Sequence, residues 1–156
     1  MNCLDEKRII ITRSEEETGR LGRCLGRWAK AGQVYALSGD LGAGKTVLAR
    51  GFAQGLEVRE TVTSPTFTLM QIYETGRLPL CHMDAYRLAD ESELEAVGGH
   101  EYLEGEGVSL VEWPELVEGL LPSHTIRIRI QRLPREGEDL RRITIQGEVP
   151  DDCFSD

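Results

Sequence analysis

One short segment, GDLGAGKT at residues 39–46, decides the fold that this sequence predicts. It satisfies the pattern G-x-x-x-x-G-K-[S/T] at each fixed position. The apolar residues 34–37 before it are typical of a buried strand, and the residues from Lys45 to about Gln54 after it are typical of a helix. A glycine-rich turn between a strand and a helix directs several backbone N–H groups at one point, where the helix dipole adds positive potential. The segment therefore predicts a phosphate-binding P-loop.

The side chains of this loop match the chemistry of a nucleoside triphosphate. Lys45 supplies a compact positive charge for the β- and γ-phosphates, and it is one of only three lysines beside 15 arginines. Thr46 supplies a hydroxyl oxygen, a hard ligand of the kind that Mg²⁺ prefers. The other loop residues are expected to surround the phosphates: Asp40, Leu41, Gly42, Ala43 and Gly44.

Two later strands end in a carboxylate. Asp84 follows the apolar residues 80–83, and Glu112 follows residues 108–111. A P-loop requires an acid at the end of a neighbouring strand for Mg²⁺ or its water shell, so one carboxylate is expected to serve the metal and the other the attacking water. His82, two residues before Asp84, is expected to be a packed or hydrogen-bonded side chain. Trp113 is either a cover for the nucleotide or a core aromatic.

The periodicity of the chain predicts an α/β protein with a mostly parallel sheet flanked by helices, and with antiparallel edge strands at the C-terminus. We expect one domain over residues 1–156, with 148–156 as a frayed, flexible tail and Trp28 in the core. Strands are expected at 8–12, 34–37, 67–75, 80–83, 108–111, 126–130 and 140–145, and helices at 14–31, 45–54, 88–97 and 114–121.

Composition narrows the class of protein. The chain has 156 residues and a net charge of −9, which argues against a freestanding nucleic-acid binder. No apolar run approaches ~18 residues, and residues 1–8 do not resemble a signal peptide, so we expect a cytoplasmic protein without a membrane span. Reduced thiols are then the default. Cys24 and Cys81 are expected in the core, and Cys3 and Cys153 are expected to be exposed.

Charge is unevenly distributed in the sequence. Ten acidic residues and no Lys or Arg lie between Arg87 and Arg127, and six arginines follow within 127–142. Each region is either a solvated face or a docking surface for a partner of opposite charge. The sequence does not choose between these possibilities.

Four blocks, in order, resemble the TsaE (YjeE) family of small bacterial ATPases required to make threonylcarbamoyladenosine in tRNA. The blocks are GDLGAGKT at 39–46, TSPTFTL at 63–69, HMDAYRLAD at 82–90 and LVEWPE at 110–115, with a weaker match, SEEETGRLG, at 14–22. The resemblance spans about residues 14–121, and the C-terminal strands add little to it.

The resemblance implies roles for individual residues. Lys45 and Thr46 would bind the phosphates and Mg²⁺ of ATP, and Glu112 would be the second protein ligand to Mg²⁺. Asp84 would be the catalytic acid–base or the residue that positions water. The resemblance also places four further residues at or near the nucleotide: Ser64 and Thr66 in a switch loop, Trp113, and Ser14 close to the adenine.

The family also implies partners, a TsaD–TsaB complex, with tRNA contacted only through that complex. Hydrolysis would reset the complex for another turnover. Two alternatives remain open, a P-loop kinase for a small molecule and a nucleotide-gated binding module without useful turnover. ATP is favoured over GTP because Asn2 is the only asparagine, so the N-K-x-D loop typical of guanine recognition is absent.

Overall fold

The strand, loop and helix predicted around residues 39–46 form the centre of a computed structural model that describes residues 7–154 apart from 41, 64–68, 87 and 89. The strands are β1 (Lys7–Thr12), β2 (Val34–Gly39), β3 (Met70–Tyr73), β4 (Leu80–Asp84), β5 (Val108–Glu112), β6 (Ile126–Arg132) and β7 (Arg141–Gln146). The helices are α1 (Glu15–Trp28), α2 (Lys45–Gly55), α3 (Glu91–Ala96), α4 (Gly99–Leu103) and the 3₁₀ helices η2 (Pro114–Leu120) and η3 (Asp151–Phe154).

The strands form one sheet in the order β1-β7-β6-β2-β5-β4-β3. The central strands β6, β2, β5 and β4 pair in parallel, as predicted. Antiparallel pairing occurs at both edges, because β3 returns along β4 and the β6–β7 hairpin is extended by β1. The C-terminal hairpin is therefore not the edge of the sheet. The short connection between β3 and β4 allows only an antiparallel pair, since a parallel one needs a crossover of a dozen residues or more.

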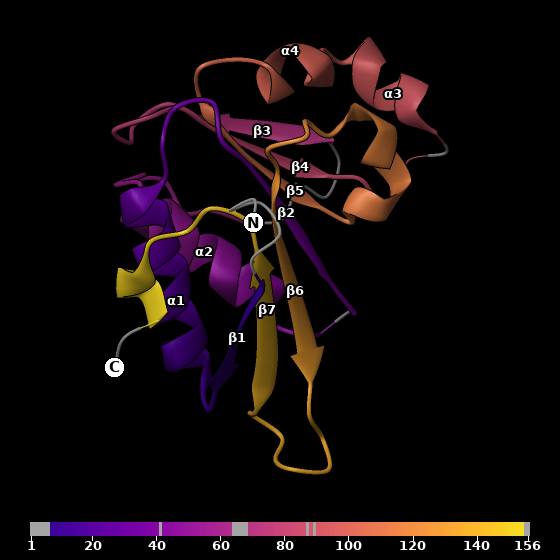
Figure 1. Cartoon of the computed structure of the whole chain (residues 1–156). Helices are drawn as coiled ribbons and strands as arrows, with labels where there is room; N and C mark the ends of the chain where they lie inside the picture. The colour runs from indigo at the N-terminus through magenta and orange to yellow at the C-terminus, as the bar shows by residue number, and fades with distance from the viewer. Residues whose placement is uncertain (1–6, 41, 64–68, 87, 89, 155–156) are drawn as a thin grey trace.

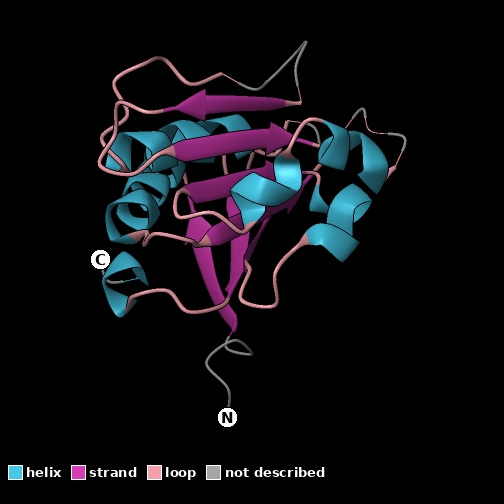
Figure 2. Cartoon of the chain, turned by 90° about the horizontal axis from the view of Figure 1, so that it is seen from above, coloured by secondary structure: helices cyan, strands magenta, loops and turns pink. Residues whose placement is uncertain are grey.

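Helices cover the two faces of the sheet unequally (Figures 1 and 2). The helices α1 and α2 pack on one face of the sheet, against apolar residues of β4, β5, β2, β6 and β7 that include Leu37, Leu110 and Ile128. On the opposite face, α3, α4 and η2 gather at the β3–β4–β5 end and enclose a second core around Met83 and Val111. No helix among the described residues is long and apolar enough to cross a membrane.

Glycines set the close approach of α1 to α2. A Cβ atom at Gly22 would lie 2.4 Å from the carbonyl oxygen of Leu48, and one at Gly26 would lie 2.0 Å from that of Phe52. Helix α2 repeats the arrangement, because a Cβ at Gly51 would lie 2.2 Å from the carbonyl oxygen of Gly19. Larger side chains would force the helices apart, so these glycines fix the position of the helix that begins at the P-loop.

Helix α1 begins as predicted and ends earlier than predicted. The Ser14 hydroxyl accepts a hydrogen bond from the Glu17 N–H at 3.1 Å, which caps the first turn. At the other end, Arg77 Nη2 donates to the carbonyl oxygens of Gly26, Arg27 and Ala29 at 2.7–2.8 Å. These bonds satisfy carbonyls that a longer helix would have used. The prediction that Trp28 lies in the core is wrong, because this last residue of α1 is 43% exposed.

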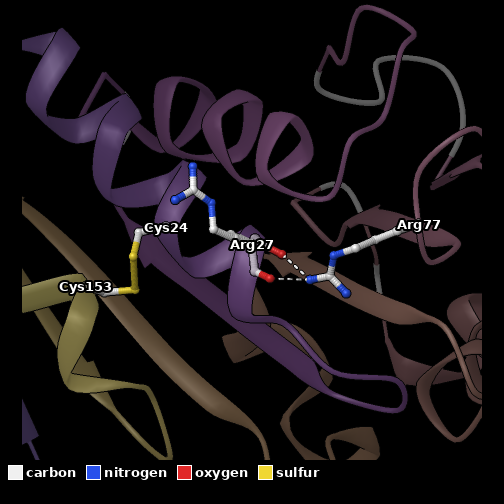
Figure 3. Close-up of a disulfide and its surroundings, with 5 residues drawn as sticks. Cys24, Arg27, Arg77 and Cys153 are labelled. Atoms are coloured by element: carbon white, nitrogen blue, oxygen red, sulfur yellow. Dashed lines mark hydrogen bonds between the residues drawn. A yellow bond between two sulfur atoms is a disulfide. The ribbon is translucent and has the colours of Figure 1, made fainter.

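The C-terminal segment is folded onto α1, contrary to the frayed tail expected from the sequence. Cys153 in η3 is buried and forms a disulfide with Cys24 of α1, with Cα atoms 5.5 Å apart (Figure 3). The prediction of an exposed Cys153 and of reduced thiols at both positions is wrong. The two cysteines are 129 positions apart, so only the packing of η3 on α1 brings them together. Cys81 is a buried free thiol, as predicted, and Cys3 lies outside the described residues.

The region between β3 and β5 differs from prediction in its boundaries. The helix expected over 88–97 is shorter, and α4 follows it after Gly98 adopts a left-handed conformation with φ 83°. The strand expected over 67–75 is observed as β3, and part of its predicted start lies outside the described residues. The three short helical segments α3, α4 and η2 thus lie over the β3–β4–β5 end of the sheet.

Candidate functional site

The carboxyl ends of three neighbouring parallel strands meet at one edge of the sheet. Asp84 is opposite Glu112 in the β4–β5 register, and Glu112 is opposite Leu37 in the β5–β2 register, just before the P-loop. Because side chains alternate along a strand, Asp84, Glu112 and His82 face the same side as Leu110, which packs beneath α1 and α2. Helix α2 begins on that side with Lys45. The fold therefore brings both predicted carboxylates to the first turn of α2.

The backbone of the P-loop depends on glycine at three described positions: Gly39, Gly44, and Gly42 with φ 78°. A Cβ at Gly39 would lie 2.6 Å from the carbonyl oxygen of Ile130, so β2 passes too close to β6 for a side chain there. Gly44 has φ 110° at the N-cap of α2, a conformation that other residues rarely adopt. The chain between them reverses with a hydrogen bond from the Ala43 N–H to the Asp40 carbonyl oxygen at 3.0 Å. Leu41 lies outside the described residues.

Arg141, at the start of β7, holds this loop from the C-terminal part of the chain. Its Nε donates to the carbonyl oxygen of Ala43 at 2.8 Å, and Nη1 donates to the carbonyl oxygens of Glu138 and Leu140 at 2.6 and 3.0 Å. The guanidinium thus ties the P-loop to the β6–β7 turn. Arg141 could not be predicted as a site residue, because it is one of six arginines within 127–142 and belongs to no motif.

Lys45 is held within its own loop in this structure. Its Nζ donates to the Gly39 carbonyl oxygen at 2.7 Å and lies 3.6 Å from the centre of the Trp113 ring. Burial lowers the pKa of this ammonium, whereas the charges of Glu112 and Asp84 act in the opposite direction. The side chain is only 6% exposed. A positive charge is therefore held at the first turn of α2, bonded to a backbone carbonyl of the same loop.

Glu112 is buried and oriented by His82. The Oε2 atom of Glu112 lies 2.6 Å from Nε2 of His82, and both side chains are nearly inaccessible to solvent. This contact confirms the prediction that His82 is a hydrogen-bonded, packed residue. The other ring nitrogen, Nδ1, is buried and has no hydrogen-bond partner within the described ranges. The pair fixes the Glu112 carboxylate while leaving its second oxygen for another ligand.

Asp84 is a half-buried carboxylate at the end of β4. Burial raises its pKa, and the nearby Glu112 charge adds to that effect. The Tyr86 N–H donates to Asp84 Oδ1 at 3.0 Å and opposes the shift by stabilising the ionised form. A carboxylate with a raised pKa accepts a proton more readily than an exposed aspartate does, which suits acid–base work beside the P-loop.

Trp113 covers the site from the other side. Its backbone is left-handed with φ 57°, which turns the ring over Lys45 and against Tyr86, at 4.9 Å between ring centres. A pocket of ≈ 540 Å³ opens beside it, lined by Asp40, Arg129 and Arg132 among others. Trp113 is therefore a neighbour of the P-loop. The sequence analysis did not single out Tyr86, its stacking partner.

The remaining predicted site residues are less clearly placed. Ser14 caps α1 through its hydroxyl, and its proximity to adenine stays a prediction. Ser64 and Thr66 lie outside the described residues, as does most of the proposed switch loop. Thr46 is half-buried in the first turn of α2.

The oxygen ligands at this edge fit a hard metal ion whose other coordination positions are filled by a substrate and by water. Within the described ranges, no three His, Cys, Asp or Glu side chains gather closely enough to hold a metal ion by themselves. Mg²⁺ differs from zinc in this respect, because proteins hold it through one or two side chains while phosphates and water complete the octahedron. The Thr46 hydroxyl and the Glu112 carboxylate are ligands of that kind.

Comparison with known proteins agrees with this geometry. The sequence model of a family described as "Threonylcarbamoyl adenosine biosynthesis protein TsaE" matches residues 12–143. The chain belongs to the TsaE family. The match includes the P-loop, both carboxylates and the first half of β7, which begins at Arg141.

Relatives in the TsaE family cover most of the chain. It is 48% identical over 133 residues to the tRNA threonylcarbamoyladenosine biosynthesis protein TsaE of Bacillus subtilis, covering 85% of this chain and 81% of the relative. It is 42% identical to the TsaE protein of Treponema pallidum, with 86% and 97% coverage. A crystal structure of Bacillus subtilis YdiB superposes with a TM-score of 0.74 at 39% identity, covering 96% of this chain and 90% of that one. The P-loop NTPase fold and the place of the family in tRNA threonylcarbamoyladenosine biosynthesis follow from these matches.

Proposed function

We propose that this protein is a Mg²⁺-dependent ATPase of the cytoplasm that acts on a TsaD–TsaB complex and allows repeated rounds of tRNA threonylcarbamoyladenosine formation. One observation supports the catalytic part above all others. Lys45, Glu112 and Asp84, from three separate parts of the chain, converge on the glycine-rich loop at the start of α2.

Each residue of the site has a distinct role in this proposal. The backbone of residues 40–44 and the first turn of α2 surround the phosphates, and Lys45 exchanges the Gly39 carbonyl for phosphate oxygens. Thr46 and Glu112 would hold Mg²⁺, with Glu112 oriented by His82. The metal, when bound, would offset negative charge on the phosphates. Asp84 accepts a proton from, or orients, the attacking water.

The acidic character of the chain supports an indirect role toward tRNA. A net charge of −9 disfavours independent binding to a polyanion, so the proposal assigns tRNA contact to the TsaD–TsaB complex. Trp113 would then lie beside bound ATP, and Ser64 and Thr66 would respond to its γ-phosphate.

The experiment that tests the proposal measures phosphate release from ATP by the purified full chain, with and without Mg²⁺ and with and without the TsaD–TsaB complex. We expect slow, Mg²⁺-dependent release that changes severalfold when the complex is added. Asp84→Asn should bind ATP normally and lose release. Hydrolysis that is indifferent to Mg²⁺, or unchanged in Asp84→Asn, would contradict the site.

A further inference from the structure

At the end of the sheet formed by β1, β7 and β6, one face is not covered by any helix that the structure describes. These strands bury Ile128, Ile143 and Ile145 beneath α1 on one side. On the reverse side the alternate residues point outward, and α3, α4 and η2 gather at the other end of the sheet (Figure 1). We call this outward surface the basic sheet face and define it by six residues: Lys7, Ile9, Ile11, Arg129, Arg142 and Thr144.

The strand register arranges these residues in rows. Ile9 is opposite Thr144, and Thr144 is opposite Arg129 on the next strand. Ile11 is opposite Arg142 in the neighbouring row. The face therefore has an apolar border on β1 and cations on β7 and β6.

Two exposed isoleucines lie on this surface. Ile9 is 64% exposed, the largest value among the exposed large apolar side chains of the described residues, and Ile11 is 37% exposed. Contiguous exposed apolar groups on a soluble protein indicate an interaction site. Arginine around an apolar patch is also typical of protein–protein interfaces.

The charge of the face is opposite to that of the chain. None of the outward positions of β1, β6 and β7 is acidic, although the chain has a net charge of −9. Lys7, Arg129 and Arg142 form no ion pair with any residue that the structure describes. The neighbouring Arg127 is different, because it is paired with Glu118. The three cations are thus available to an external anion.

The acidic stretch is less available. Glu118 is paired with Arg127, and Glu91 accepts a hydrogen bond from the Gly119 N–H at 2.9 Å, so both hold the helical segments of that region together. Apolar residues of the same segments, such as Leu94 and Leu103, are buried. These segments also expose Val97, Tyr102 and Leu116, by 42–48%, so the choice of the basic sheet face rests on its cations, which are unpaired within the described ranges, and on Ile9, which is 64% exposed.

The basic sheet face also borders the nucleotide site. Arg129 lines the ≈ 540 Å³ pocket that contains Asp40 and Trp113. Arg141, next to Arg142 on β7, is bonded to the P-loop at Ala43. A macromolecule on this face would contact the strand that holds the P-loop.

The composition of the face favours a protein over RNA. The chain has a net charge of −9, which disfavours binding to a polyanion, and the two exposed isoleucines offer apolar contacts that a phosphate backbone cannot return. A second copy of the chain, docked through its acidic helices, would use two unlike surfaces and would assemble into a closed ring or an open chain of molecules, not into a twofold dimer.

We propose that the basic sheet face is the docking surface for a partner protein that presents carboxylates around an apolar patch. This assignment rests on the proposed function for the identity of the partner, the TsaD–TsaB complex. Binding there would place the partner against the edge of the ATP site and against the strand that positions the P-loop.

The test measures the affinity of the full chain for purified TsaD–TsaB complex by biolayer interferometry at about 0.05 and 0.2 M salt. Arg142→Glu and Ile9→Asp are the test variants, and Arg135→Glu, an exposed arginine in the β6–β7 turn, is the matched control. We expect Arg142→Glu and Ile9→Asp each to weaken binding at least tenfold, and Arg135→Glu to change it less than twofold. Wild-type binding should weaken as salt rises, since salt screens exposed charges.

Several outcomes would overturn the proposal. Wild-type affinity in both test variants would exclude this face while leaving the proposed function intact. A wild-type chain that does not bind the complex at all would defeat the proposed function, and the assigned partner with it. Labelled tRNA bound by the wild-type chain and lost in Arg142→Glu would assign the face to RNA, and concentration-dependent self-association lost in Ile9→Asp would assign it to a second copy. Circular dichroism and ATP affinity of each variant separate these results from misfolding.

Discussion

The charged side chains of the sheet lie in two different environments. We compare the parallel half, formed by β4, β5 and β2, with the antiparallel half, formed by β6, β7 and β1. In the parallel half, the charged side chains at the strand ends are buried or half-buried and engage one another, as Glu112 does with His82 and Lys45 does with the P-loop. In the antiparallel half, Arg129 and Arg142 lie exposed on a face with no acidic residue. A buried charge needs a specific partner to offset the free energy of its desolvation. An exposed charge stays hydrated at little cost and can bind a group from another molecule.

We interpret the parallel half as the part suited to a chemical reaction and the antiparallel half as the part suited to docking. A reaction at the P-loop requires groups held in fixed positions, which burial and paired hydrogen bonds provide. Docking requires an accessible surface, which bare strands provide. Arg141 connects the halves, because it belongs to β7 and bonds to the Ala43 carbonyl of the P-loop. Substitutions in each half test this assignment.

Lys45→Ala should produce the largest effect, because it removes the positive charge of the ammonium group at the P-loop. Nucleotide affinity should fall by roughly 100-fold, since each hydrogen bond to a charged group contributes about 1.5–3 kcal/mol and more than one is lost. The fluorescence of Trp113, measured in a Trp28→Phe background with no other tryptophan, reports binding. An unchanged ATP titration in Lys45→Ala would break the assignment of this half as the nucleotide site.

Glu112→Gln should lower Mg²⁺-dependent hydrolysis by roughly 100-fold and affect ATP binding without metal much less. The amide keeps the shape of the side chain and removes the negative charge that a metal requires. His82→Asn should have a smaller effect of the same kind, about tenfold, because His82 only orients the carboxylate. A Mg²⁺ titration of hydrolysis distinguishes the two. Equal Mg²⁺ dependence in the wild type and Glu112→Gln would contradict the role of Glu112.

Arg141→Gln tests the link between the halves. Loss of its bond to the Ala43 carbonyl should loosen the P-loop and weaken ATP binding about fivefold to tenfold, equivalent to about 1–1.4 kcal/mol. Arg142→Gln is the matched control, since this neighbouring side chain points to the opposite face, and its ATP affinity should stay within twofold of wild type. Similar losses in both variants would show that the effect is one of general charge rather than of P-loop geometry.

The disulfide joins α1 to η3 and supplies no group to the proposed nucleotide site, so its loss should affect stability alone. Cys24→Ser should lower the free energy of unfolding by about 2–4 kcal/mol under oxidising conditions, because the bond closes a long loop between α1 and η3. Urea unfolding with and without reductant measures the change, and Cys3→Ser, which keeps the pair, is the control. ATP affinity that falls with the disulfide would join this region to the nucleotide site.

The smallest effect is expected at Cys81, which lies on β4 three residues before Asp84. Burial raises the pKa of the Cys81 thiol to about 12, so the reactive thiolate stays scarce until the pH approaches that value. Iodoacetamide at pH 8 should leave Cys81 unmodified in the folded protein and alkylate it after denaturation, as mass spectrometry can show. Rapid labelling of the folded protein at pH 8 would contradict the tight packing of β4.

The sequence predicted the parallel half well because local patterns encode it. The P-loop has a fixed spacing, and the strands ending at Asp84 and Glu112 are short apolar runs with an acid at the end. Parallel neighbours align their carboxyl ends, so finding the strands was enough to predict that these residues meet. The sequence also predicted that His82 is packed or hydrogen-bonded, but it did not identify Glu112 as the partner.

The antiparallel half and the C-terminal segment were not predictable in the same way. The bond from Arg141 to Ala43 joins residues 98 positions apart, and the Cys24–Cys153 pair joins residues 129 apart. Neither contact has a local signature, because each depends on how β1, β7 and η3 pack at the end of the chain. Trp28 was misplaced for a related reason, since its exposure depends on where α1 ends.

Formation of threonylcarbamoyladenosine in tRNA over many turnovers tests the central claim most directly. The reaction is reconstituted with TsaB, TsaD and the enzyme that supplies the threonylcarbamoyl-adenylate, with the wild-type chain, with Lys45→Ala or with neither. The account predicts that product stalls near one turnover of the complex without the protein or with Lys45→Ala, and continues with the wild type. Product that accumulates equally in all three reactions would contradict it.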